Sequence, residues 1–235
     1  GCGDCSVQSN CISVEPLETE FGRKRAINQS SCNKDYSCVK GFCPSFVTID
    51  GGALRKRVPA ELGDFGALPP PATTPSLDRP YNVAVAGVGG TGVLTIGALL
   101  GMAAHIEGKA SMILDISGLA QKGGAVLSHV RLSRNTDDVT CSRIVTGTAD
   151  LLIAADEIVG ASKDAMTLCE AQRTQGIINT HLIPIADFIR NRDFDFQYGK
   201  VNHVLEGALK KVSTFFDFTH IAESLLGDSI ATNVM

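Results

Sequence analysis

Residues 81–106 decide the fold, and they read YNVAVAGVGGTGVLTIGALLGMAAHI. The first six residues combine valine with small alanine, as a short buried strand does. A glycine-rich run, Gly87-Val-Gly-Gly-Thr-Gly92, follows at once, and residues 93–106 then carry apolar side chains at helical spacing. In the order strand, turn, helix, such glycines let a ligand approach the backbone, and the helix N-terminus offers N–H groups to an anion. The sequence therefore predicts a ligand-binding turn at Gly87, Gly89, Gly90 and Gly92.

The residues beyond this unit alternate between strand and helix patterns. Strands are expected at residues 110–116, 125–132, 151–155 and 176–179, and helices near residues 156–170, 184–191, 201–213 and 219–227. This alternation predicts an α/β fold with a doubly wound, largely parallel, Rossmann-like sheet. Ligands of such sheets bind at the carboxyl ends of the strands, which is where both glycine-rich segments, residues 87–92 and 118–124, fall.

A second glycine-rich loop, Gly118-Leu-Ala-Gln-Lys-Gly-Gly124, joins two of the expected strands. Its amide, its lysine and its glycines predict an anion-binding or partner-binding surface at Gln121, Lys122, Gly123 and Gly124. The following strand carries Ser128, His129 and Arg131, which either extend this surface or are ordinary polar residues with satisfied side chains. Asp115 ends the preceding strand and leaves open a dinucleotide-dependent oxidoreductase, in which an acidic residue holds the ribose.

Six of the eight cysteines fall within residues 2–43. Cys-x2-Cys spacing places two thiolates on one tight turn, and a Cys-Pro pair that ends a cysteine array is typical of bacterial ferredoxins. The sequence therefore favours iron–sulfur ligation by Cys2, Cys5, Cys11, Cys32, Cys38 and Cys43. Two alternatives stay open, namely a disulfide framework and a zinc-stapled interaction protein with zinc on Cys2, Cys5, Cys38 and Cys43. Cys141 and Cys169 stand apart and are expected to be ordinary buried thiols.

Composition divides the chain into three parts. We expect a cysteine segment at residues 1–50, a proline-rich linker at about residues 51–80, and an α/β domain at residues 81–235. The chain begins without methionine and ends without a closing turn, so we expect a fragment that is truncated within the α/β domain.

The overall balance of residue types excludes several classes of protein. Hydrophobic residues make up 44% of the chain and charged residues 20%, which excludes wholesale disorder. The net charge of −4 argues against a nucleic-acid binder. No apolar run reaches the roughly eighteen residues that a membrane span needs.

Several motifs together resemble a known family. The stretch from Val83 to Val93, with Gly118–Gly124 and Ser128-His-Val-Arg131, resembles the gamma domain of 2-oxoacid:ferredoxin oxidoreductases. The cysteine segment, with Phe21-Gly-Arg-Lys-Arg25 and Phe42-Cys-Pro-Ser-Phe46, narrows the resemblance to the fused indolepyruvate ferredoxin oxidoreductases of bacteria. The resemblance covers essentially the whole chain.

This resemblance implies a chemistry. In such enzymes thiamine diphosphate, held with magnesium, attacks a 2-oxo acid such as indolepyruvate, and carbon dioxide leaves. Coenzyme A takes the acyl group, and electrons pass through 4Fe–4S clusters to ferredoxin. The six cysteines would then be cluster ligands, enough for one 4Fe–4S cluster and for part of a second that is completed from outside.

The resemblance also implies what lies elsewhere. No Gly-Asp-Gly run, which is the usual thiamine and magnesium signature of the family, occurs in this chain. The thiamine site is therefore expected in other domains of the same polypeptide, which we expect to be a cytoplasmic homodimer. No catalytic residue is assigned to this chain, and the 235 residues alone are not expected to decarboxylate a 2-oxo acid.

Overall fold

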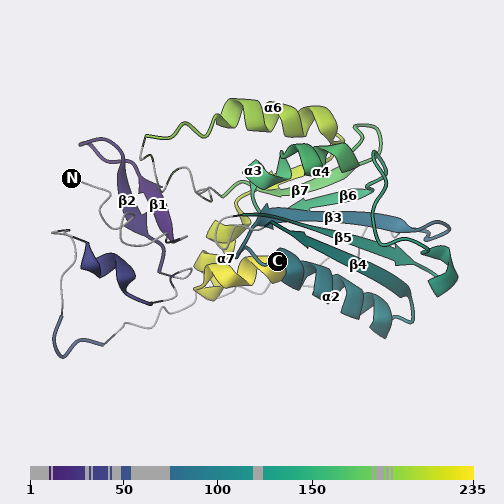
Figure 1. Cartoon of the computed structure of the whole chain (residues 1–235), viewed down its shortest axis with the longest axis horizontal. Helices are drawn as coiled ribbons and strands as arrows, with labels where there is room; N and C mark the ends of the chain where they lie inside the picture. The colour runs from purple at the N-terminus through teal and green to yellow at the C-terminus, as the bar shows by residue number, and fades with distance from the viewer. Residues whose placement is uncertain are drawn as a thin grey trace.

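The computed structural model describes most of the α/β domain and parts of the cysteine segment. The described residues are 13–29, 34–41, 49–53, 75–118, 124–181 and 193–235, with residues 11, 32, 43, 183, 188 and 191. Figure 1 shows a central sheet with helices on both faces and a small two-stranded hairpin at one end. Within these described residues no helix is long and apolar enough to cross a membrane.

The central sheet has six strands in the order β4-β5-β3-β6-β7-β8. Their bounds are Ala110–Ser117 for β4, Ala125–Ser133 for β5, Tyr81–Val88 for β3, Leu151–Ala154 for β6, Gln175–Asn179 for β7 and Thr214–Phe216 for β8. β3, β6, β7 and β8 pair in parallel, whereas β5 runs against both of its neighbours, β3 and β4. Five strands therefore point in one direction, which confirms the predicted α/β fold with a largely parallel sheet.

The reversal of β5 has a simple cause. Only residues 118–124 join β4 to β5, and a parallel connection needs a crossover of a dozen residues or more. The short loop can therefore connect only antiparallel strands. One consequence is that the carboxyl end of β4 lies at the same edge of the sheet as the carboxyl end of β3.

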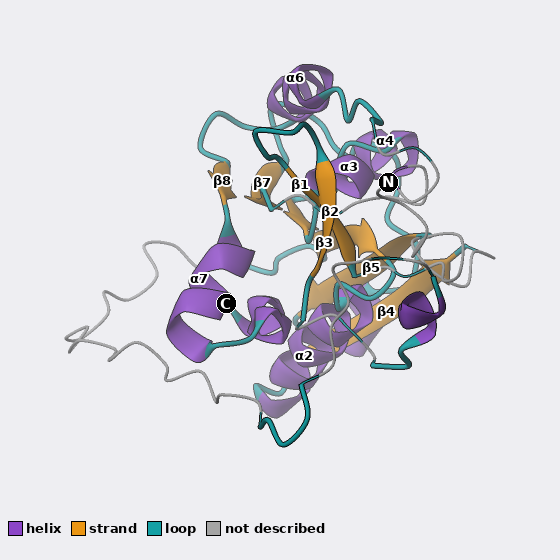
Figure 2. Ribbon diagram, turned by 90° about the vertical axis from the view of Figure 1, so that its left-hand side faces the viewer, coloured by secondary structure: helices purple, strands orange, loops and turns teal. Residues whose placement is uncertain are grey.

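Helices cover both faces of the sheet, as the doubly wound prediction requires (Figures 1 and 2). On one face lie α2 (Val93–Ile106), α7 (Phe218–Leu226) and the short 3-10 helix η3 (Ser229–Val234). On the other face lie α3 (Glu157–Gly160), α4 (Lys163–Leu168) and α6 (Tyr198–Ala208).

Most expected elements agree with the observed ones to within a few residues, although the helix expected at residues 201–213 is α6 and ends at Ala208. The helix expected at residues 156–170 is two short helices, because Ser162 begins a new one by accepting a hydrogen bond from the Ala165 N–H. β8 was not predicted, because three residues are too few to show a period, and the two short strands of the cysteine segment were not predicted either. The helix expected at residues 184–191 lies almost wholly outside the described residues.

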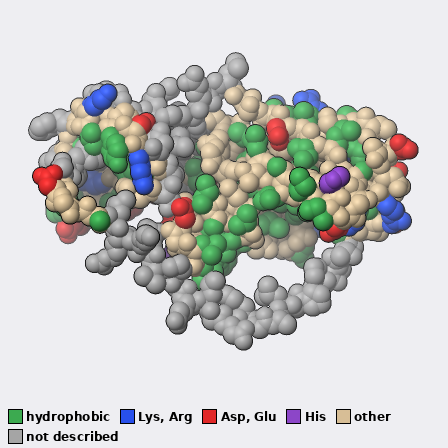
Figure 3. All heavy atoms as spheres, turned by 90° about the horizontal axis from the view of Figure 1, so that it is seen from below, with side chains coloured by type: hydrophobic (Ala, Val, Ile, Leu, Met, Phe, Trp, Pro, Cys, Tyr) green, Lys and Arg blue, Asp and Glu red, His purple; other side chains and the backbone are tan. Residues whose placement is uncertain are grey.

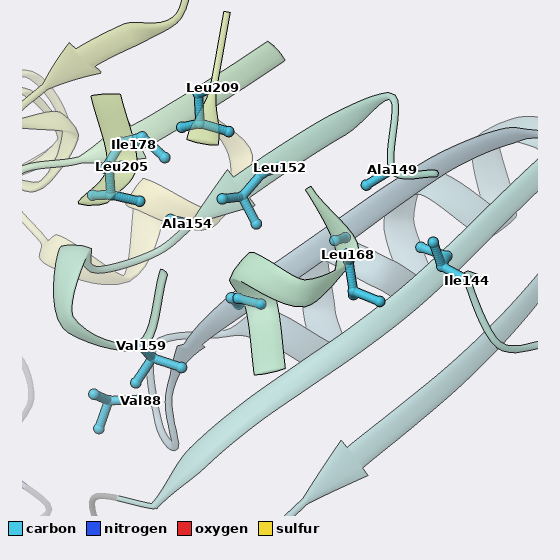
Figure 4. Close-up of a cluster of buried hydrophobic side chains, with 13 residues drawn as sticks. Val88, Ile144, Ala149, Leu152, Ala154, Val159, Leu168, Ile178, Leu205 and Leu209 are labelled. Carbon is cyan, nitrogen blue, oxygen red and sulfur yellow. The ribbon is translucent and has the colours of Figure 1, made fainter. Parts of the chain in front are cut away.

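The main hydrophobic core lies between the sheet and the layer of α3, α4 and α6 (Figure 4). Leu152, Ile178 and Leu205 are fully buried there. Ala84 and Ala86 on β3 have no exposed surface, and their small side chains let the helices pack close to the strand. This core fixes the positions of β3, β6 and β7, whose carboxyl ends carry the candidate site.

The described part of the cysteine segment is a hairpin of β1 (Val14–Leu17) and β2 (Lys24–Ile27), followed by a 3-10 helix, η1 (Ser37–Lys40). Val14 packs against Phe188 and Phe196 of the α/β domain. The Arg23 guanidinium donates to the Phe194 carbonyl at 2.9 Å. The hairpin therefore rests on the α/β domain, and its boundary with the expected linker stays a prediction, because residues 54–74 lie outside the described residues.

Candidate functional site

The glycine-rich turn links the end of β3 to the start of α2. The Thr91 hydroxyl donates to the Val88 carbonyl at 2.7 Å and closes the turn. Gly90 and Gly92 adopt φ angles of 103° and 86°, a region that favours glycine. A Cβ added to Gly87 would lie 2.6 Å from the Thr91 hydroxyl and 2.9 Å from the Ala155 methyl. The turn thus needs glycine both for its backbone shape and for its close packing.

The second glycine-rich loop meets the first at the same edge of the sheet, as the sequence predicted. The Gly89 N–H donates to the Gly124 carbonyl at 2.7 Å. Gly124 therefore lies beside Gly89, and the two loops form one surface. Residues 119–123, which include the predicted Gln121, Lys122 and Gly123, lie outside the described residues.

Asp156 links the end of β3 to the start of α3. Its carboxylate accepts from the Val88 N–H at 2.7 Å and from the Val159 N–H, at the start of α3, at 2.8 Å. Burial raises the pKa of Asp156, although the backbone N–H groups oppose that shift. The sequence analysis did not select this residue, but an aspartate directly after an apolar strand and before a helix is a typical N-cap signal.

Asn179, at the end of β7, ties three elements together. Its amide nitrogen donates to the Ala155 carbonyl at 3.1 Å and to the Thr219 hydroxyl at 2.9 Å. Its oxygen accepts from the backbone N–H groups of His181 and Phe218. This buried side chain therefore sets where the chain leaves β7 and where α7 begins.

These elements enclose a cavity of about 140 Å³ at the carboxyl edge of the sheet, which we call the edge cavity. Its walls come from the glycine-rich turn, the ends of β6 and β7, the β1–β2 hairpin, the start of α7 and the η3 helix. The lining includes Gly89, Gly90, Thr91, Asn179, His181, Thr219, Asn233, Glu15 and Asn28. The cavity thus lies where the cysteine segment meets the α/β domain.

His181 is a titratable residue that lines the edge cavity. Its Nδ1 lies 3.4 Å from the Asp217 carboxylate, and its Nε2 lies 4.0 Å from the Glu15 carboxylate on β1. Glu15 raises the pKa of His181 most, burial opposes the shift, and Asp217 adds to it. A protonated His181 therefore bridges the hairpin and α7. Sequence patterns could not reveal this contact, because the three residues are far apart in the chain.

The start of α2 is covered by the chain's own η3 helix. A Cβ on Gly92 would lie within 2.1 to 2.4 Å of the side-chain atoms of Asn233. The Asn233 carboxamide therefore lies against the helix N-terminus that the sequence analysis offered to an anion. Gly89, Gly90 and Thr91 of the same turn line the edge cavity.

Ser128, His129 and Arg131 have structural contacts and do not line this cavity. Ser128 and His129 are buried, and His129 Nδ1 accepts from the Ile144 N–H at 2.9 Å. Burial lowers the pKa of His129, and Arg143 lowers it further. Arg131 donates to Asn82 and to the Cys141 carbonyl. His129 and Arg131 hold the loop after β5 onto the sheet. Ser128 Oγ and His129 Nε2 are buried and have no hydrogen-bond partner among the described residues, so the expectation of satisfied side chains was wrong for these two atoms.

Asp115 is poorly placed to hold a ribose. It is exposed on β4, and β5 separates β4 from β3. Two strand spacings, or about 10 Å, therefore lie between Asp115 and the strand that carries the glycine-rich turn. In dinucleotide folds the acidic residue ends the strand next to that turn. The observed strand order disfavours the dinucleotide alternative.

The cysteines are described only in part. Cys11, Cys32 and Cys43 form no disulfide bond, and Cys38 lies in η1. Two backbone groups point at sulfurs: the Ser13 N–H lies 3.4 Å from Cys11 Sγ, and the Lys34 N–H lies 3.4 Å from Cys32 Sγ. Cys2 and Cys5 lie outside the described residues, and among the residues that the structure does describe, no three Cys, His, Asp or Glu side chains converge on a metal position.

The two remaining cysteines behave as the sequence predicted in one case only. Cys169 is partly buried, and burial raises the pKa of its thiol to about 11. Cys141 is exposed, because it lies in the polar loop after β5 and not in the core. The expectation of a buried thiol was therefore wrong for Cys141.

Comparison with known families decides the relationship of the chain. The family model described as "Pyruvate ferredoxin/flavodoxin oxidoreductase" matches residues 82–235. The chain belongs to this family. This confirms the resemblance of the glycine-rich motifs and places the α/β domain among oxidoreductases of 2-oxo acids.

Curated relatives are similar over a shorter stretch. The indolepyruvate oxidoreductase subunit IorB of Pyrococcus horikoshii is 30% identical over 107 residues, which are 46% of this chain and 49% of the relative. IorB of Methanothermobacter thermautotrophicus is 32% identical over 111 residues, which are 47% of this chain and 53% of the relative. The chain spans about half the length of the curated relatives it matches.

Solved structures show more distant likeness. The gamma subunit of a keto/oxoacid ferredoxin oxidoreductase from Geobacter sulfurreducens is 21% identical, with a TM-score of 0.43 over 66% of this chain and 71% of that one. A 2-oxoglutarate:ferredoxin oxidoreductase from Magnetococcus marinus is 16% identical, with a TM-score of 0.47 over 66% of this chain and 23% of that one.

Proposed function

We propose that this chain is the iron–sulfur and gamma portion of an indolepyruvate:ferredoxin oxidoreductase that uses thiamine diphosphate. The observation that carries the proposal is the family membership of residues 82–235, joined in one chain to a segment with six cysteines. Thiamine diphosphate and magnesium belong to further domains of the parent polypeptide, and coenzyme A is the acyl acceptor. Ferredoxin is the electron acceptor, and the parent is a homodimer.

The cysteine segment supplies the ligands of the clusters. Cys2, Cys5, Cys11, Cys32, Cys38 and Cys43 offer soft sulfur donors, which iron–sulfur clusters require. The N–H groups of Ser13 and Lys34 fit this role, because hydrogen bonds to ligating sulfurs disperse their negative charge and raise the reduction potential. A bound 4Fe–4S cluster would supply one-electron transfer.

The α/β domain supplies a surface at the carboxyl edge of the sheet. Gly87, Gly89, Gly90, Gly92 and Gly124 shape this surface, and Gln121, Lys122 and Gly123 belong to the same loop as Gly124. The lysine of this loop suits a negatively charged group of a ligand or of a neighbouring domain. The hairpin touches this edge through Glu15 and Asn28, so the cysteine segment and the surface are neighbours.

Anaerobic purification followed by iron and sulfide analysis tests this function. We expect a brown protein with about four iron and four sulfide per cluster, whose absorption near 400 nm bleaches with dithionite. Cys11→Ser and Cys32→Ser should each lower the iron content, whereas the matched variants Cys141→Ser and Cys169→Ser should leave it unchanged. Zinc without iron would instead support the zinc-stapled interaction protein, and disulfide-bonded cysteines would contradict both.

A further inference from the structure

A second cavity lies under the η3 helix, next to the edge cavity. It has a volume of about 150 Å³, and we call it the η3 cavity. Figure 3 views the side of the molecule on which α2 and α7 lie, and hydrophobic side chains gather on this face. The cavity lies between these helices, η3 and the ends of β6 and β7, and its lining is Ile96, Ile153, Ala154, Ala155, Ile177, Asn179, Phe218, Thr232, Asn233 and Met235.

The η3 cavity lies beside the point where the connections of the sheet diverge. β3 leads through α2 to β4 on one side, whereas β6, on the other side of β3, leads through α3 and α4 to β7. Open α/β sheets bind their ligands outside the carboxyl ends of the strands at such a point. The Ala155 N–H donates to the Ala86 carbonyl of β3 at 2.8 Å, so this wall of the cavity lies where β3 and β6 meet.

The lining of the η3 cavity is mostly apolar. Among the described residues that form it, none is charged, and three isoleucines, two alanines, Phe218 and Met235 supply most of it. Of its three polar residues, Asn179 already has its amide nitrogen and its oxygen in hydrogen bonds, and the Thr232 hydroxyl donates to a carbonyl within η3 at 2.6 Å. The Asn233 carboxamide forms no hydrogen bond with the other described residues. Asn233 therefore has donors and an acceptor to offer a ligand.

We propose that the η3 cavity binds a small, neutral aromatic molecule that carries one hydroxyl or N–H group. An apolar cavity of about 150 Å³ lined by leucine, isoleucine and phenylalanine is known to hold a benzene ring, so the size of the η3 cavity fits one six-membered ring. Phe218 and Met235 are side chains that pack well against aromatic rings. The Asn233 carboxamide would bind the polar substituent. A charged ligand is disfavoured, because this lining would leave its charge unpaired.

Such a ligand would also hold η3 over the glycine-rich turn. The side-chain hydrogen bond that joins η3 to α7, between the hydroxyls of Thr232 and Thr219, is long at 3.5 Å, and Ile230 of η3 is 71% exposed. Asn233 lies against Gly92 on one side and lines the η3 cavity on the other. A ligand bound to Asn233 would therefore stabilise η3 in the position in which it covers the start of α2.

Nuclear magnetic resonance of the full 235-residue chain, labelled with ¹³C at its isoleucine methyl groups, tests the proposal. The probes are phenol and toluene, which have nearly the same shape. We expect each probe to shift the methyl resonances of Ile96, Ile153 and Ile177 in a saturable way. Ile113 and Ile144 do not line the cavity, so their resonances should stay in place and report that the fold is intact. Benzoate, which is charged, should cause no saturable shift.

Substitutions in the lining separate the roles of size and hydrogen bonding. Ile177→Phe should raise the dissociation constant of phenol at least about tenfold by filling the cavity, and Ile96→Phe is a second filling variant on a different element. The matched control Ile106→Phe changes an exposed residue at the end of the same helix and should leave the constant unchanged. Asn233→Leu should weaken phenol at least about fivefold and leave toluene within about twofold, because it removes the partner of the hydroxyl group.

Hydrogen exchange measures the effect on η3. With phenol at ten times its dissociation constant, the amides of η3 should exchange roughly tenfold more slowly, because the ligand binds only when η3 is in place. The proposal is overturned if neither probe causes a saturable shift, if benzoate binds as well as phenol, or if both filling variants leave phenol binding unchanged. Equal losses of phenol and toluene in Asn233→Leu, or unchanged exchange of η3, would also overturn it. These measurements need neither a cluster nor a 2-oxo acid, so their outcome is independent of the proposed redox function.

Discussion

Every residue of β3 from Asn82 to Val88 is buried, whereas none of the four residues of β2 is. The α/β domain has a large core of its own, which includes Leu152 and Ile178. The described part of the cysteine segment instead packs Val14 against Phe188 and Phe196 of the other region. Because the described part of this segment shows no core of its own, we expect the segment to need a metal or cross-links for stability. The difference shows that the α/β domain has its own core, whereas the described hairpin docks on that domain, and under the proposed function the cysteine segment also depends on ligation.

The largest expected effect comes from removing iron. In small metal-bound modules the free energy of metal binding contributes directly to folding. A chelator should therefore lower the hydrogen-exchange protection of the amides in Val14–Ile27 at least about a hundredfold. Protection of β3 and β6 should stay the same. The Cys141→Ser variant serves as the control and should respond like the parent chain. Unchanged protection of the hairpin after complete iron loss would contradict the claim that this region depends on ligation.

A core substitution should affect the α/β domain strongly. Leu152→Ala removes a fully buried side chain from the main core and should lower the free energy of unfolding by about 2–5 kcal/mol. Val212→Ala, at an exposed site, should change it by less than about 0.5 kcal/mol. Urea unfolding followed by circular dichroism measures both. A loss below about 1 kcal/mol for Leu152→Ala would mean that this core does not dominate stability.

Asp156→Ala should have an intermediate effect. It removes the acceptors of the Val88 and Val159 N–H groups, so we expect a loss of about 2–3 kcal/mol. Asp228→Ala removes an exposed cap at the start of η3 and should cost less than about 1 kcal/mol. Thermal unfolding of the two variants compares them. If both variants lost the same free energy of unfolding, the buried link between β3 and α3 would contribute no more stability than an exposed helix cap.

The Asp150 ion pairs predict a smaller, pH-dependent effect at the other edge of the sheet. Burial favours the neutral acid, but hydrogen bonds from Arg79, the Asn82 N–H and Arg173 hold the pKa of Asp150 below its usual value. The stabilisation is therefore present above about pH 4 and is lost as the pH falls through the lowered pKa. Arg79→Ala should cost about 1 kcal/mol at pH 7, because water screens this exposed side chain, and almost nothing in strong acid.

Urea titrations at both pH values measure this difference. Arg134→Ala is the control, because Arg134 pairs with Asp78 in an exposed contact and its loss should have little effect at either pH. An Arg79→Ala loss that is the same at neutral and acid pH would show that packing, not charge, is responsible.

The smallest expected effect concerns the contact between the two regions. The pKa of His181 is raised, chiefly by Glu15, so its stabilising contact is fully present below pH 6.5 and is lost as the pH rises through the raised pKa. Hydrogen exchange of β1, corrected for intrinsic rates, should be a few-fold faster at pH 8 than at pH 6. His181→Gln should remove this dependence, and His220→Gln should keep it. A dependence that survives His181→Gln would assign it to another group.

Local patterns in the sequence predicted the elements that are determined locally. The apolar alternation before Gly87 and the helical spacing after Gly92 were enough to place β3 and α2. The meeting of Gly89 with Gly124 followed from the rule that ligand loops gather at the carboxyl ends of strands. The direction of β5 depended on a loop length that the sequence analysis did not use.

The rest of the site depends on contacts between distant residues. Glu15, His181 and Asp217 meet only because the hairpin docks on the edge of the sheet. The cover of Gly92 by Asn233 likewise joins residues more than a hundred positions apart. Residue periodicity or spacing within one segment cannot predict such contacts. The N-cap role of Asp156, in contrast, could have been recognised from its place between a strand and a helix.

Electron paramagnetic resonance of the oxygen-free chain after dithionite reduction tests the central claim most directly. The account predicts the signal of a reduced 4Fe–4S cluster, which Cys11→Ser and Cys32→Ser diminish and Cys141→Ser leaves intact. A silent spectrum from protein that holds no iron when purified without oxygen would contradict it.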